Sequence, residues 1–136
     1  MNPASAEPGP PDPPHERWAV RALVAYACVL FGATHYPRLH LPAPVPHTDK
    51  WLHWLAYGLL AWLAWRAAYA RWRVLSPRFV WKAALVLLAY AGFDEWTQQF
   101  ANRSPDMGDW LADATGIVVV LAVMELRRRI GAPATS

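Results

Sequence analysis

Half of the carboxylates in this 136-residue chain lie in one short stretch, residues 94–116, which reads DEWTQQFANRSPDMGDWLADATG. Strongly apolar runs precede and follow it. Charged side chains beside such runs are costly to bury and usually face a bundle interior or a water-filled cavity. The stretch therefore predicts a polar site whose acids could form hydrogen bonds, take up protons or hold a cation. The acids are Asp94, Glu95, Asp106, Asp109 and Asp113.

A second polar group stands earlier in the chain, where Asp49 and Lys50 precede an apolar run. His53 and Tyr57 follow Asp49 at intervals of four residues, so the three would form one stripe on a helix. Lys50 could contact a phosphate or carboxylate group.

The same spacing recurs in the acidic stretch. Gln98 follows Asp94 by four residues, and Asp113 follows Asp109 by four. Gly116 continues the second stripe and permits a close approach between helices. We expect these faces to point toward each other and toward the positive charges around them.

Four apolar segments are available to position these residues. Each has roughly 17 to 20 residues, about the length that a helix needs to cross a bilayer. The segments lack the alternation of strands, and strands in lipid would have to close into a barrel. The sequence predicts an all-α membrane protein with four transmembrane helices in a small bundle. The segments are 18–34, 51–70, 80–93 with an extension to 96, and 110–126.

Basic residues set the expected orientation. If both termini are cytoplasmic, ten of the 13 Lys and Arg residues lie inside, and Arg38, Lys50 and Arg103 lie outside. The positive-inside rule favours this multi-pass arrangement in the cell inner or plasma membrane. Because the basic residues bracket apolar segments, nucleic acid is not an expected partner; the bilayer is. The single cysteine, Cys28, is expected to be a small buried side chain.

The chain divides into one domain and two tails. Residues 1–16 are rich in proline and predict a disordered tail. Residues 17–129 form the four-helix domain, and residues 130–136 form a short C-terminal tail.

Three ordered motifs resemble the VanZ-like family of small integral membrane proteins, named for a protein that lowers susceptibility to the glycopeptide antibiotic teicoplanin. They are D-K-x-x-H-x-x-x-Y at 49–57, D-E-x-x-Q at 94–98 and R-x5-D-x3-[ND]-x-x-G at 103–116. The resemblance covers residues 17–129, and Asp113 stands where many members have asparagine. The matching positions are Lys50, His53, Glu95, Gln98, Arg103, Asp109 and Gly116.

The first functional hypothesis is an outward-facing acidic pocket that binds a cell-envelope ligand, either lipid-linked or of glycopeptide type. Lowered glycopeptide susceptibility is what the resemblance implies. Arg103 and Lys50 would contact phosphate or carboxylate groups. The ligand-binding candidates are Asp49, Lys50, His53, Tyr57, Asp94, Glu95, Gln98, Arg103, Asp109 and Asp113.

Two alternatives stay open. In the first, Glu95, Asp109 and Asp113 hold a divalent metal with His53 as base or ligand, and the protein is an enzyme acting on a lipid-linked phosphate. In the second, the polar residues only stabilise the bundle. Arg103 would then pair with Asp109, Ser104 or Asp106 would cap the last helix, and Gly116 would serve packing. The sequence assigns no catalytic residue and no oligomeric state.

Overall fold

The computed structural model describes residues 14–36, 48–72 and 75–131, without the side chains of residues 14, 15 and 77. Four α-helices and one short 3-10 helix account for most of them. The predicted all-α bundle of four helices is confirmed. The elements are α1 (Pro14–Thr34), α2 (Thr48–Trp72), α3 (Pro77–Thr97), η1 (Gln98–Ala101) and α4 (Met107–Ile130).

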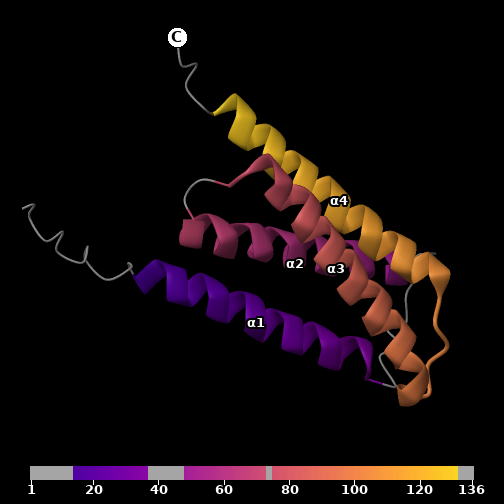
Figure 1. Cartoon of the computed structure of the whole chain (residues 1–136). Helices are drawn as coiled ribbons and strands as arrows, with labels where there is room; N and C mark the ends of the chain where they lie inside the picture. The colour runs from indigo at the N-terminus through magenta and orange to yellow at the C-terminus, as the bar shows by residue number, and fades with distance from the viewer. Residues whose placement is uncertain (1–13, 37–47, 73–74, 132–136) are drawn as a thin grey trace, which may run out of the picture.

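The order of helices around the bundle differs from their order along the chain. The most extensive packing is between α2 and α4, while α1 packs on α2 and α3 packs on α4. In Figure 1 the end of α1, the end of α3 with η1, and the start of α4 gather at the lower right. Segments far apart in the sequence therefore meet at one end of the bundle.

Close contact between α2 and α4 depends on Gly116. A Cβ atom at this position would overlap the carbonyl oxygen of Trp54 and lie 3.3 Å from the backbone nitrogen of Gly58. Below this contact, Tyr57, Ile117 and Leu121 are almost completely buried. The packing role predicted for Gly116 is confirmed, and it fixes how near α4 can bring its acids to α2.

The outer surface of the bundle is strongly apolar. Trp18, Trp81 and Ile130 are among many large hydrophobic side chains that are more than half exposed. Of the helices described, two segments, Glu16–Thr34 and Met107–Ile130, are long and apolar enough to cross a membrane. By the same measure of length and composition, the described parts of α2 and α3 fall short. Membrane crossing by all four helices remains a prediction.

The helices extend beyond the apolar segments that predicted them. Because α2 begins at Thr48, Asp49 and Lys50 lie in its first turn. Likewise, residues 14–16 of the predicted tail belong to α1, whereas 1–13 lie outside the described residues. The C-terminal tail is described only at Ile130, which ends α4, and Gly131.

The prediction that Cys28 is buried is wrong. Its side chain is exposed on α1. The reason is that α1 packs mainly on α2 and leaves much of its apolar surface outside the bundle.

Candidate functional site

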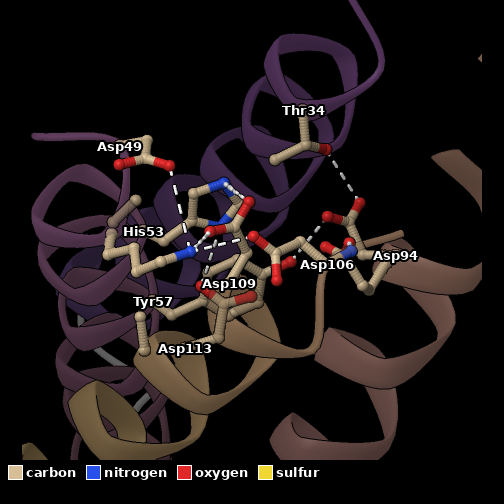
Figure 2. A network of polar contacts seen from close by, with 12 residues as sticks. Thr34, Asp49, His53, Tyr57, Asp94, Asp106, Asp109 and Asp113 are labelled. Carbon is tan, nitrogen blue, oxygen red and sulfur yellow. Dashed lines mark hydrogen bonds and ion pairs between the residues drawn. The ribbon is translucent and has the colours of Figure 1, made fainter. Parts of the chain in front are cut away.

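Polar side chains from all four helices meet at one end of the bundle in what we call the polar layer. Figure 2 shows how its acids converge on residues of α1 and α2. The layer consists of Thr34, His35, Lys50, His53, Tyr57, Asp94, Glu95, Gln98, Asp106, Asp109 and Asp113.

Lys50 joins α2 to the start of α4. Its Nζ lies 2.9 Å from Asp106 Oδ2 and 2.9 Å from Asp109 Oδ1. Asp106 also caps α4, because its Oδ1 accepts a hydrogen bond of 2.7 Å from the Gly108 backbone nitrogen. The cap predicted for Asp106 is confirmed. The Lys50 ammonium and the Gly108 N–H together lower the pKa of Asp106 from its ordinary value.

His53 lies between two buried acids of α4. Its Nδ1 is 3.0 Å from Asp113 Oδ1, and its Nε2 is 3.7 Å from Asp109 Oδ2. The ring stacks almost parallel to that of Tyr57, with centroids 6.5 Å apart. Asp113 is 1% exposed, and its Oδ2 is the buried side-chain oxygen without a hydrogen-bond partner among the described residues. An imidazolium at His53 would balance charge on both acids.

Asp94 ties α3 to both α1 and α2. Its Oδ2 accepts a hydrogen bond of 2.8 Å from the Tyr57 hydroxyl, and its Oδ1 accepts one of 2.9 Å from the Thr34 hydroxyl. His35 Nδ1 lies 3.6 Å from Asp94 Oδ1, and the other ring nitrogen of His35, Nε2, lies 2.9 Å from the Thr97 hydroxyl. A carboxylate that is 1% exposed is thus surrounded by donors, as a buried charge requires.

Glu95 holds the chain between α3 and α4. It accepts hydrogen bonds from Gln98 Nε2, at 3.0 Å, and from the backbone nitrogen of Asp106. Asn102 adopts a left-handed conformation, with φ 55°, directly after η1. Asparagine tolerates this backbone conformation better than most residues. The reversal lets the chain return from the end of α3 to the start of α4.

Arg103 is not part of the ion pair predicted for it. Its Nη1 donates a hydrogen bond of 2.6 Å to the backbone carbonyl of Thr34, near the end of α1. The predicted pairing with Asp109 is wrong, because Lys50 occupies that position. The parallel packing of α2 on α4 puts the first turn of α2 beside Asp109.

A pocket opens between α1 and α2 beside the polar layer. Its volume is about 220 Å³. One part of its wall is apolar, formed by Leu30, Ala33, Leu52 and Ala56, and the rest is polar, formed by Thr34, Asp49, His53, Tyr57 and Arg103. A pocket with these two kinds of wall can accept a ligand that has an apolar part and a charged part.

The predicted site residues fall into two groups. Asp49, His53, Tyr57 and Arg103 line the pocket. The other candidates do not line the pocket. They belong to the polar layer, through the contacts described above. They are Lys50, Asp94, Glu95, Gln98, Asp109 and Asp113.

The metal hypothesis finds no support in the arrangement of the acids. Within residues 14–36, 48–72 and 75–131, no group of three or more His, Cys, Asp or Glu side chains is arranged to hold a metal ion. Two of the three proposed ligands have other partners: Glu95 accepts from a backbone N–H and from Gln98, and Asp109 accepts from Lys50. Asp113 contacts His53 through one oxygen only.

Sequence reasoning missed the contribution of α1. Thr34 and His35 reach Asp94, and Thr34 also accepts from Arg103. Their position in the sequence could have revealed them, because they stand where the first apolar segment ends. The predicted topology puts that end of the segment in the same layer as the acids. Thr97 was missed too; its hydroxyl is close to His35.

Comparison of the chain with protein-family models, with curated proteins and with solved structures found no match in any of the three. The VanZ-like resemblance therefore stays a prediction from three motifs. The site has to be interpreted from its own geometry.

Proposed function

We propose that the chain is an integral membrane protein of VanZ-like type that binds a cell-envelope amphiphile in the pocket between α1 and α2. Both termini are cytoplasmic in this proposal, and the polar layer lies at the outer surface. The ligand is lipid-linked or of glycopeptide type, and its binding would lower glycopeptide susceptibility. The observation that carries the proposal is the pocket itself, in which an apolar wall continues into a wall that bears Arg103 and His53.

Arg103 is well suited to recognise the charged part of such a ligand. Its bond to the Thr34 carbonyl uses Nη1 and fixes the guanidinium at the pocket. The planar guanidinium has five N–H donors, so others remain for phosphate or carboxylate oxygens. His53 lies on α2 at the same pocket, and when protonated it is a further N–H donor whose charge is balanced by Asp109 and Asp113.

The apolar outer surface supports the membrane part of the proposal. Monomeric soluble proteins rarely expose large continuous apolar surfaces. Here large side chains are exposed along every helix, for example Val29 at 68%, Leu59 at 43%, Leu85 at 70% and Leu126 at 57%. Lipid contact would remove this surface from water.

A structural role of the polar layer is the second candidate function. The observation that favours it is the dense pairing of the buried acids, in which Asp94, Glu95 and Asp109 each have at least one donor on another element. In that case the layer holds the helix ends together and the pocket has no ligand. The metal-dependent enzyme is not taken further, because the acids do not gather into a ligand set.

The two candidates differ in what removal of Arg103 does to ligand binding. We would purify the full chain in detergent and measure its thermal stability with lipid-linked cell-wall precursors and with teicoplanin. We expect a rise in Tm for the wild type that Arg103→Gln abolishes. The matched control is Arg78→Gln, which changes an exposed arginine in the first turn of α3. This variant should respond to the ligands like the wild type.

No rise in Tm with any member of the panel would contradict ligand binding. If Arg103→Gln only lowered the Tm of the unliganded protein, the structural role would be preferred. A parallel measurement of teicoplanin susceptibility in cells that express either form would test the resistance that the resemblance implies.

A further inference from the structure

A second hollow lies between α3 and α4, at the opposite end of the bundle from the polar layer. Figure 1 shows the first turns of α3 beside the last turns of α4. The hollow has a volume of about 360 Å³. Its walls are apolar, with Val80 and Ala84 from α3 facing Leu121 and Ala122 from α4. It is therefore separate from the pocket between α1 and α2.

Glu125 lines this hollow and binds two arginines, of which Arg129 also lines the hollow. Glu125 Oε1 lies 2.7 Å from Arg129 Nε and 2.7 Å from Arg128 Nη2, while Glu125 Oε2 lies 2.8 Å from Arg128 Nε. One carboxylate against two guanidinium groups leaves a net positive charge. Arg129 itself lines the hollow and its side chain is 65% exposed, so its outer N–H groups face the surroundings.

The combination fits an anionic phospholipid. Basic pockets between transmembrane helices on the cytoplasmic side bind anionic head groups, and apolar grooves accept acyl chains. Trp81 also lines the hollow and is 80% exposed, which suits the bilayer interface, where tryptophan is enriched. The apolar walls would contribute nothing to the binding of a free phosphate ion.

We propose that the hollow between α3 and α4 binds an anionic phospholipid of the inner leaflet. One acyl chain lies along the walls, and the phosphate accepts hydrogen bonds from Arg129. This rests on the membrane insertion and orientation of the proposed function, but not on the pocket between α1 and α2.

A comparable groove between α2 and α4 supplies an internal control. It too has a volume of about 360 Å³ and is lined by apolar residues with one arginine, Arg127. Arg127 forms no ion pair with the described acids, whereas Glu125 orders Arg129 in advance. A guanidinium that is already ordered loses less conformational freedom on binding. We therefore expect the lipid to prefer the hollow at Arg129.

The test is a lipid titration of the full chain in detergent, monitored by native mass spectrometry. Phosphatidylglycerol should bind more tightly than phosphatidylcholine with the same acyl chains. Arg129→Gln should weaken phosphatidylglycerol binding about tenfold, because a charge-assisted hydrogen bond is lost. Arg127→Gln removes the same charge two residues away and should leave the affinity unchanged.

A photoactivatable phosphatidylglycerol would locate the lipid without any substitution. Cross-links to the walls of the hollow support the proposal, whereas cross-links only around Arg127 overturn it. Equal binding of the two lipids, equal effects of the two arginine changes, or competition by inorganic phosphate alone would also overturn it. Arg103→Gln separates the two proposals, since it should abolish ligand binding in the pocket and leave phosphatidylglycerol binding intact.

Discussion

The hydroxyl of Tyr57 donates a hydrogen bond of 2.8 Å to Oδ2 of Asp94, and it does so at the boundary between the polar layer and the apolar core. Tyr57 is 0% exposed and Asp94 is 1% exposed. The bond connects α2 to α3, two helices that otherwise contact each other little. A buried carboxylate thereby joins elements that apolar packing alone holds weakly.

Tyr57→Phe should lower the free energy of unfolding by about 1–3 kcal/mol, because Asp94 Oδ2 then loses its buried donor. Tyr69→Phe, on the same helix at a 45% exposed position, is the control and should change little. Denaturation in mild detergent, followed by circular dichroism, measures both. Equal stability of the two variants would contradict the importance of the bond.

Gly116→Ala should destabilise the bundle by about 1–3 kcal/mol, since the added methyl group would overlap the Trp54 carbonyl and force α2 and α4 apart. Gly32→Ala is the matched control. No heavy atom lies within 4 Å of its would-be Cβ atom, so the replacement should be neutral or stabilising by up to about 1 kcal/mol. Thermal unfolding of the two variants side by side would decide, and a stable Gly116→Ala protein would argue against the close helix contact.

Lys50→Met should cost roughly 2 kcal/mol, because Asp109 is largely buried and would lose its cationic partner. The same change at Lys82, an exposed residue at the other end of the bundle, should have a much smaller effect. Unfolding by denaturant gives the comparison. A loss of stability at Lys82 as large as that at Lys50 would indicate a general effect of lysine removal.

The pairing of Asp106 with Lys50 predicts a pH dependence of stability. Because the folded pKa of Asp106 is lowered, its charge stabilises the folded protein above the unfolded pKa of about 4. That stabilisation disappears as the pH falls through the folded pKa. Asp106→Asn retains a capping side chain but not the charge, so the Tm advantage of the wild type over this variant should shrink below about pH 4. A constant difference between pH 7 and pH 3 would contradict the assignment.

Membrane topology can be measured directly with reporter fusions. We expect fusions after Arg73 and after Arg128 to report a cytoplasmic position, because basic residues gather at those ends of the chain. A fusion after Arg103 should report the outer side. If all three fusions reported the same side, the four-span arrangement would be wrong.

The sequence by itself determined the helices and the layer in which their polar ends lie. Apolar segments of sufficient length predict helices, and their alternating direction puts Asp49, Asp94 and Asp109 at the same end. The cap at Asp106 was likewise predictable, since it follows from local backbone geometry, and the packing role of Gly116 was predictable because a glycine continues the stripe of Asp109 and Asp113. The sequence carries this information because residues spaced four apart lie on the same face of a single helix.

Only the tertiary structure decided which partner each polar side chain has. The packing order of α1, α2, α4 and α3 brings Lys50 to Asp109 and leaves Arg103 beside the end of α1. It also adds Thr34 and His35 to the layer and opens the pocket between α1 and α2. Such pairings depend on how helices rotate and approach one another, and that depends on the whole core, with no signature in the spacing of any one segment.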